Sequence, residues 1–195
     1  MTAHANVMGY TRYLSHVEIV YCPGEKELVR RFLGVLGIST EDAMDGRFIV
    51  SIIEPETYEP LHFANFMGGS QVHPEQWEFD QALKEAVTTG PLAESFAKYQ
   101  EKLNREPTSG MHVGIHYSTI DAWEAAVARL YTLLDDVPEL TGRFRICSVT
   151  RPGDPDSVAP LYQAFIWTDV VSSGSLALGQ RFELSAIDPA DVTAA

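Results

Sequence analysis

The chain has 195 residues, of which 45% are hydrophobic and 21% are charged, as in ordinary globular proteins. This length allows one domain or two closely packed halves and is too short for a large multidomain assembly. Its 14 basic and 27 acidic residues give a formal net charge of −13, which repels nucleic-acid backbones and anionic lipid surfaces. We therefore expect neither nucleic acid nor a membrane as partner.

The sequence also favours a location in the cytoplasm. No stretch approaches the roughly 20 apolar residues of a membrane helix, and the first residues lack the basic region and apolar core of a signal peptide. Cys22 and Cys147 lie in apolar runs without metal-type spacing, which is typical of reduced core cysteines. These features predict a cytoplasmic protein.

A short segment that occurs twice is the clearest clue to how the chain is organised. Residues 15–21 read SHVEIVY and residues 111–117 read MHVGIHY, so His16 and His112 each open an apolar alternation typical of a strand. Each copy is followed by a turn and then by apolar residues at helical spacing. The echo predicts two similar halves.

In the first half, the strand pattern leads into a helix and then into further strands. Leu28, Phe32 and Val35 share one helix face, and Gly37 is a typical helix end. Two β-type runs follow, separated by turn-forming residues: 47–53 and 61–66. We expect the first module to span residues 12–66.

The segment from Pro74 to Arg105 breaks the symmetry because it is polar and rich in helix formers, with Gly90-Pro91 dividing it in two. One apolar stripe runs along its second part: Leu92, Phe96, Tyr99 and Leu103. We expect a helical insertion over residues 67–110, which packs over the sheet edge, closes over a site or contributes to a dimer contact.

The second half repeats the order of the first. Trp123, Val127 and Leu130 share a helix face, and Thr119 or Asp121 is a suitable cap for that helix. Three β-type runs then follow: 143–149, 161–171 and 180–187. The sequence therefore predicts an α+β fold of two βαβββ modules, the second over residues 111–188.

A duplicated βαβββ unit with metal-capable residues on its first and last strands resembles the vicinal oxygen chelate superfamily. That group includes glyoxalase I, extradiol dioxygenases and antibiotic-binding resistance proteins. The resemblance rests on the two H-V-x-I segments and on the closing strand Phe182-Glu183-Leu184. It implies that the two modules form a glyoxalase-like half-barrel pair, and it makes a homodimer possible.

The resemblance further implies one divalent metal between the modules, held by four side chains: His16, His62, His112 and Glu183. The pattern supports Glu183 independently, because it alternates with apolar residues and a buried carboxylate needs a partner such as a cation. Imidazole and carboxylate ligands suit Zn, Ni, Co, Mn or Fe. Ordinary hydrogen bonding to the backbone is the alternative for a single histidine, and it stays open for His62.

Other side chains are candidates for the surroundings of the metal. Glu183 is a possible base as well as a ligand, while His116 and Glu18 share the inward faces of their strands and are candidates for proton transfer. Three further residues are candidates for substrate contacts, although Tyr and Trp in strands are commonly core residues: Tyr58, Gln163 and Trp167.

For function, the resemblance implies a lyase or isomerase that binds two neighbouring oxygens of a small substrate and stabilises an enediolate-type intermediate. If only His16, His112 and Glu183 bind the metal, the set suits Fe(II) and extradiol-type ring cleavage. A non-catalytic small-molecule binding or resistance protein is the third hypothesis. Val20 stands where glyoxalase I carries an arginine for glutathione, so we do not expect a glutathione substrate.

Overall fold

The structure is a computed structural model that describes four ranges of the chain: 16–46, 48–52, 66–158 and 160–188. Within these ranges the fold is α+β, as predicted, with four α-helices and two mixed sheets. None of the described helices is both long and apolar enough to cross a membrane.

The first sheet has the strand order β2-β3-β4-β1-β8. Its members are β1 (His16–Tyr21), β2 (Ser39–Ala43), β3 (Phe48–Ile52), β4 (Phe66–Gln71) and β8 (Val171–Ser172). Strand β1 runs parallel to β4, which pairs with β3 in antiparallel fashion. Helix α1 (Lys26–Val35) connects β1 to β2 and buries Leu28, Val29, Phe32 and Leu33, while Gly37 at φ +78° ends the helical path.

The second sheet has the order β5-β9-β7-β6 and repeats this pattern. Its members are β5 (Val113–His116), β6 (Phe144–Thr150), β7 (Leu161–Thr168) and β9 (Gln180–Ile187). Strand β5 runs parallel to β9, and helix α4 (Ile120–Asp136) connects β5 to β6. The predicted cap is present, because the Thr119 side chain accepts a hydrogen bond from the Ala122 amide. Both halves therefore have the order strand, helix, three strands, with the first strand parallel to the last.

Strands β2 and β8 were absent from the sequence prediction, and β4 overlaps the predicted run 61–66 only at Phe66, since residues 61–65 lie outside the described residues. Strand β2 is a polar edge strand, Ser-Thr-Glu-Asp-Ala, so it lacks the apolar alternation that marks a half-buried strand. Strand β8 has two residues and pairs with β1 across the halves, with Val20 opposite Ser172 and Tyr21 opposite Val171. The sequence pattern had merged β8 with β7, because the apolar run continues through the turn between them.

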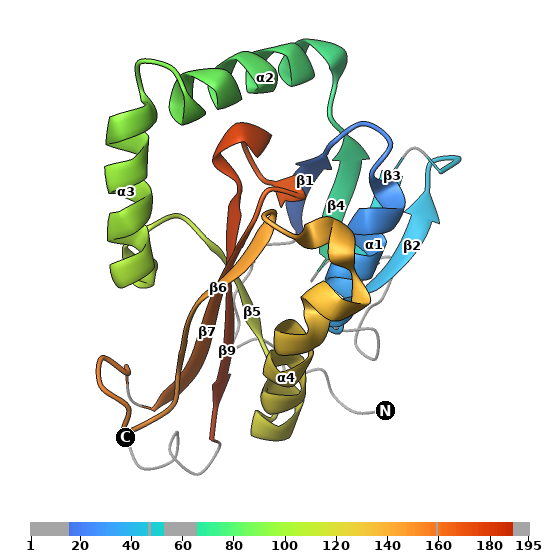
Figure 1. The fold of residues 1–195 in the computed structure, drawn as a ribbon. Coiled ribbons are helices and arrows are strands. Elements are labelled where there is room, and N and C mark those ends of the chain that lie inside the picture. The colour runs from blue at the N-terminus through green and yellow to red at the C-terminus, as the bar shows by residue number, and fades with distance from the viewer. Residues whose placement is uncertain (1–15, 47, 53–65, 159, 189–195) are drawn as a thin grey trace, which may run out of the picture.

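Helices α2 (Pro74–Thr88) and α3 (Ala93–Arg105) join the halves, and Figure 1 shows them as an L across one end and one side of the molecule. They follow β4, which ends at Gln71, so residues 67–71 belong to the first sheet. The apolar stripe of α3 is only partly covered, since Leu103 is buried whereas Leu92 and Tyr99 are exposed.

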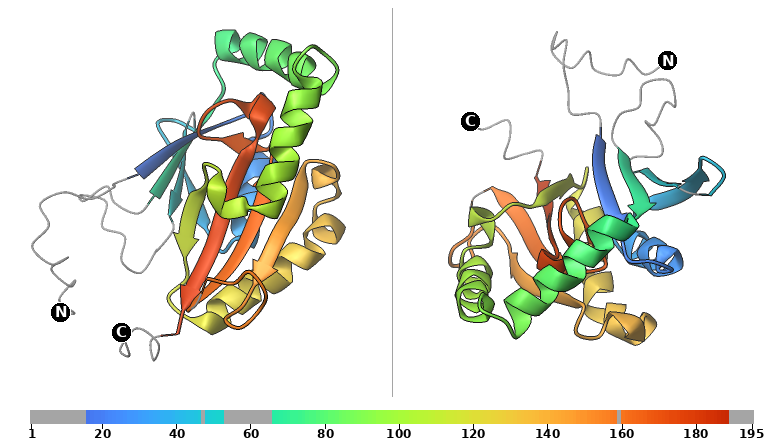
Figure 2. Two further views of the ribbon diagram at one scale, coloured as in Figure 1. Left: turned by 90° about the vertical axis from the view of Figure 1, so that its left-hand side faces the viewer. Right: turned by 90° about the horizontal axis from the view of Figure 1, so that it is seen from above.

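One apolar core joins the two sheets. Helices α1 and α4 lie beside each other, and Phe32 of α1 contacts the rings of Phe144 and Phe182 from the second half. The Trp123 indole of α4 donates to the Leu184 carbonyl at 2.8 Å. Helix α3 lies on the opposite face of the second sheet from α4, as Figure 2 shows from two further directions. This opposite face carries the polar side chains considered next.

Candidate functional site

His112 and Glu183 form a close pair on the face of the second sheet that points away from α4. The distance from His112 Nε2 to Glu183 Oε2 is 3.0 Å, and the two side chains are 24% and 17% exposed. Strand alternation explains the position of Glu183, because its neighbours Phe182 and Leu184 are fully buried on the other face.

Neighbouring groups fix how both side chains are oriented. His112 Nδ1 lies 2.8 Å from the Gly110 carbonyl oxygen, which only accepts, so this nitrogen carries a proton. Glu183 Oε1 accepts a hydrogen bond of 2.7 Å from the Gln163 side-chain amide. The edge of the Phe165 ring meets the His112 ring at a centroid distance of 5.5 Å and an angle of 86°.

This orientation directs two acceptor atoms at each other. When Nδ1 carries the proton and donates it in a hydrogen bond to the Gly110 carbonyl, the Nε2 atom of a neutral His112 presents its lone pair to the Glu183 carboxylate. Two lone pairs 3.0 Å apart need a positive charge between them, either a proton on Nε2 or a bound cation. The pair is therefore either an ion pair or part of a metal shell.

The first half carries a related pair, His16 and Glu18, on the β1 face opposite the buried Ile19 and Tyr21. His16 Nε2 lies 3.5 Å from Glu18 Oε1, and the side chains are 41% and 55% exposed. The imidazole stacks on the Phe66 ring at 5.0 Å between centroids. This pair is wider and more exposed than the pair of His112 and Glu183.

The strand registers show which positions of the two halves correspond. In the echoed segments Glu18 corresponds to Gly114, and Gly114 lies opposite Glu183 while Glu18 lies opposite Gly68. A Cβ atom at Gly68 would lie 2.5 and 2.7 Å from the Glu18 carboxylate oxygens. The carboxylate therefore comes from the last strand in the second half and from the first strand in the first half.

The other predicted site residues are dispersed. His116 is exposed and lies 3.2 Å through Nδ1 from the Ser185 hydroxyl. The Arg145 guanidinium lies over the Trp167 ring, with 4.2 Å between the Arg145 Cζ atom and the ring centroid. His62 and Tyr58 lie outside the described residues. In the described part of the chain, no three His, Cys, Asp or Glu side chains come together in a group suited to a metal.

A pocket of about 400 Å³ lies near the pair of His112 and Glu183, which do not line it but contact two residues that do. It lies between the end of α3, strands β6 and β7, and the loop that connects them. Gln163 and Phe165, which contact Glu183 and His112, line it together with the hydroxyls of Ser148 and Thr150. The volume is in the range of small-ligand sites, roughly 300–1,000 Å³.

Sequence reasoning identified Gln163 but missed most of this pocket. Asn104 and the 3-10 helix Pro107–Ser109 form the wall supplied by the insertion. The signal available was the Pro107 that ends α3, because it forces the chain to turn back just before His112. Phe165 carries no such signal, since an aromatic residue in a strand is ordinary.

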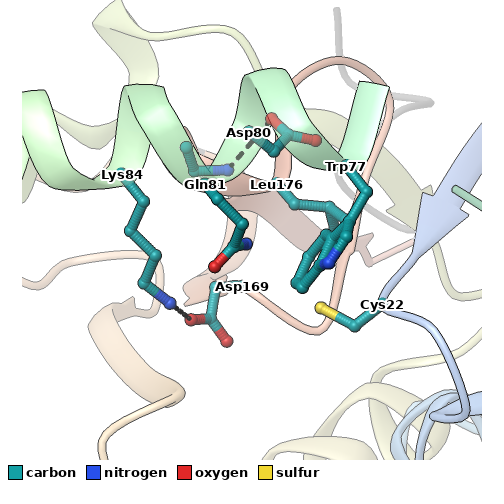
Figure 3. Close-up of a pocket in the computed structure, with 8 residues that line it drawn as sticks. Cys22, Trp77, Asp80, Gln81, Lys84, Asp169 and Leu176 are labelled. Atoms are coloured by element: carbon teal, nitrogen blue, oxygen red, sulfur yellow. Dashed lines mark hydrogen bonds and ion pairs between the residues drawn. The ribbon is translucent and has the colours of Figure 1, made fainter. Parts of the chain in front are cut away.

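A second pocket, of about 20 Å³, lies under α2 and is large enough only for water. Figure 3 shows Cys22 and Trp77 at one end of it and Lys84 and Asp169 at the other. Asp80 is 1% exposed and accepts hydrogen bonds from Ser175 and the Ala177 amide. These contacts fasten α2 to the loop before β9, so this pocket is part of how the insertion is seated.

Comparison of the chain with protein-family models, with curated proteins and with solved structures finds no match.

Proposed function

We propose that the chain is a divalent-metal-dependent enzyme of the lyase or isomerase type, acting on a small substrate with two neighbouring oxygens. The observation that carries the proposal is the pair of His112 Nε2 and Glu183 Oε2, 3.0 Å apart beside a pocket of about 400 Å³. The repeated order of strands and helix in the two halves supports it, because that order is what the vicinal oxygen chelate resemblance implies.

The donor atoms fit a transition-metal ion. Nitrogen and oxygen ligands lie about 2.0–2.2 Å from such an ion, so two adjacent ligand atoms are roughly 3 Å apart. A ligating histidine usually donates its other N–H to a carbonyl or carboxylate, as His112 does to Gly110, and a ligating carboxylate is itself hydrogen-bonded, as Glu183 is by Gln163. Both ligands are thus oriented by their neighbours.

Further ligands belong to the first half under this proposal. His16 and Glu18 occupy the equivalent positions there, and His62 remains a candidate. The two modules would then form the half-barrel pair that the resemblance implies, with one metal between them. Zn, Ni, Co, Mn and Fe all suit imidazole and carboxylate ligands.

A bound metal of this kind acts as a Lewis acid that stabilises negative charge developing on a substrate oxygen. Glu183 would hold a proton taken from the substrate, because its carboxylate is bonded to Gln163, which lines the pocket. Gln163 keeps the other carboxylate oxygen in place, and Phe165 contributes an apolar wall that limits water. Ser148 and Thr150 offer hydroxyls that can bind substrate oxygens.

Elemental mass spectrometry on protein purified without a histidine tag tests the proposal. We expect about one equivalent of a transition metal in the wild type, and a loss of metal affinity of at least about tenfold in His112→Ala and Glu183→Gln. His73→Ala is the matched control, because His73 is an exposed histidine paired with Glu75 at the start of α2, and its metal content should equal the wild type.

The identity of the metal separates the related reactions. Zn, Ni, Co or Mn supports proton transfer, whereas Fe(II) would favour ring cleavage with oxygen. If the wild type binds no metal after reconstitution, or if His112→Ala and Glu183→Gln bind as much as His73→Ala, the enzyme proposal is wrong. His112 and Glu183 would then be an ion pair beside a small-molecule binding pocket.

A further inference from the structure

A cluster of two arginines and one cysteine lies under α3, on the same face of the second sheet as Glu183. Arg181 of β9 is 4% exposed, and its Nη1 donates to Cys147 Sγ at 3.3 Å. Its Nη2 donates to Gln100 at 3.2 Å, and Arg145 Nη2 donates to the same Gln100 oxygen at 3.0 Å. The two guanidinium groups are therefore close neighbours.

Neither arginine has a carboxylate partner among the described residues. The remaining partners of Arg181 are the Leu103 carbonyl and the Asn104 side-chain oxygen, which are neutral. Arg145 stacks on Trp167, and its Nε is buried with no hydrogen-bond partner in the described chain. Burying a charge without an opposite charge is costly, so this cluster has an unmet need for an anion.

The residues that pack onto the cluster supply no negative charge. On α3 they are Gln100, Leu103 and Asn104, and the charged residues of α3 pair with one another on its exposed side: Lys98 with Glu94, Arg105 with Glu101, and Lys102 with Glu106. Burial lowers the pKa of Arg145; the Cys147 sulfur opposes that shift and the Arg181 charge adds to it. Cys147 is the one acidic group that touches the cluster in the described structure.

The backbone also sets Cys147 apart. The pairing of β6 with β7 shifts register between Ile146 and Ser148, so Cys147 lies at a β-bulge without a regular cross-strand partner. The bulge places the thiol in a half-buried position beside Arg181.

Cys22 provides a contrast within the same chain. Its Sγ also lies near an arginine, 3.8 Å from Arg143 Nη2, but Arg143 is already bonded to Glu25 at 2.6 and 2.9 Å and to Asp169 at 2.7 Å. Burial, together with the Glu25 carboxylate, raises the pKa of Cys22 to about 11. An arginine whose charge is already matched therefore does not activate a neighbouring thiol.

We propose that Cys147, which lies beside Arg145 and Arg181, is a reactive thiol and a site of alkylation by electrophiles and of oxidation by hydrogen peroxide. In the oxidation, the Cys147 sulfur attacks one peroxide oxygen, the O–O bond breaks and an S–O bond forms. The departing hydroxide takes a proton and leaves as water. The sulfur loses two electrons to give a sulfenic acid, and the peroxide is reduced by the same two electrons.

The test is limited alkylation of the folded protein with iodoacetamide, followed by peptide mass spectrometry of both cysteines over a range of pH. We expect Cys147 to react at least about tenfold faster than Cys22 at pH 7, because the thiolate is the nucleophile. Peroxide followed by dimedone should label Cys147 and leave Cys22 unlabelled.

Variants of Arg145 separate charge from folding, since Arg181 also seats α3 and its loss would disturb the structure. Arg145→Met should slow alkylation of Cys147 several-fold at pH 7, and Arg145→Lys should restore most of the rate. The rate of Cys22 in each variant reports whether the fold is intact. Equal rates for the two cysteines, or an alkylation rate of Cys147 that Arg145→Met leaves unchanged, would overturn the proposal.

Discussion

The two halves of the molecule each bring a histidine close to a glutamate, but they take the glutamate from different strands. Each places a histidine and a glutamate on the sheet face opposite its connecting helix, but the second half takes the carboxylate from its last strand and the first half from its first strand. Glu183 stands opposite Gly114, and Glu18 stands opposite Gly68, but only Gly68 leaves room that the carboxylate across the strand pair fills.

The surroundings of the two pairs differ more than the pairs themselves. Gln163 and Gly110 hold Glu183 and His112, and both side chains are less than a quarter exposed. In the first half the imidazole stacks on Phe66, and Glu18 remains 55% exposed. In the second half, hydrogen bonds to neighbouring groups hold the histidine and the glutamate in place. In the first half, the two side chains are farther apart and more exposed.

The largest expected effect tests whether the halves are independent. Phe32 belongs to the first half and is fully buried, yet its ring contacts Phe144 and Phe182 of the second. We expect Phe32→Ala to lower the free energy of unfolding by about 3–5 kcal/mol. Trp fluorescence reports largely on Trp123 and Trp167 in the second half. Because the halves share one core, the urea midpoint measured by Trp fluorescence should fall by the same amount as the midpoint measured by far-UV circular dichroism.

Tyr131→Ala is the matched control for that measurement, because this helical aromatic is 65% exposed, and its effect should stay within about 0.5 kcal/mol. If Phe32→Ala moved the circular dichroism transition and left the fluorescence transition in place, the halves would unfold separately. The comparison would then be between two domains rather than between two parts of one core.

Alanine substitutions at Gly68 and Gly114 test how the space across from the two glutamates differs between the halves. A Cβ atom at Gly68 would overlap the Glu18 carboxylate and lie closer still to the Phe48 ring, whereas nothing lies within 4 Å of a Cβ at Gly114. We expect Gly68→Ala to lower the free energy of unfolding by about 1–3 kcal/mol through overpacking. Gly114→Ala should change it by no more than about 0.5 kcal/mol.

Urea midpoints for both glycine variants, with the slope of the transition checked for constancy, provide the measurement. Equal losses in the two variants would contradict the structure, in which a Cβ atom at Gly68 meets Glu18 and Phe48 and a Cβ atom at Gly114 meets nothing within 4 Å. A neutral Gly68→Ala would indicate the same, and the carboxylate of Glu18 would then be free to point elsewhere.

Most of the repeated architecture and the closeness of His112 to Glu183 were predictable from the sequence. His112 and Glu183 were predictable because the echoed segment marks a first strand and an isolated Glu between apolar residues marks a last strand. The helical insertion was predictable because its polarity and its Gly90-Pro91 break are local properties.

Properties that depend on contacts between distant segments were not predictable. Gly68 acquires its role only when β4 pairs with β1 in one particular register, and a shift by one residue would remove it. The wall of the pocket formed by Asn104 depends on how Arg181 seats α3 across the sheet. The two arginine environments of Cys22 and Cys147 likewise follow from tertiary packing, since both cysteines have similar apolar sequence neighbours.

The smallest expected effect concerns the charged link between the halves, Glu25 with Arg143. Burial raises the pKa of Glu25, but the hydrogen bonds and charge of Arg143 lower it by more, so the folded-state pKa lies below the ordinary value of 4.5. A carboxyl group of this kind stabilises the fold above its unfolded pKa, and that stability is lost as the pH falls through the folded pKa. Arg143→Gln should therefore cost about 1–2 kcal/mol at pH 6 and much less near pH 3, as measured by urea unfolding across that range.

Arg151→Gln is the control, because its pair with Glu124 is about 40% exposed and lies within the second half, and it should cost less than about 1 kcal/mol. A loss in Arg143→Gln that stayed constant from pH 6 to pH 3 would show that Arg143 joins the halves by packing rather than by its charge.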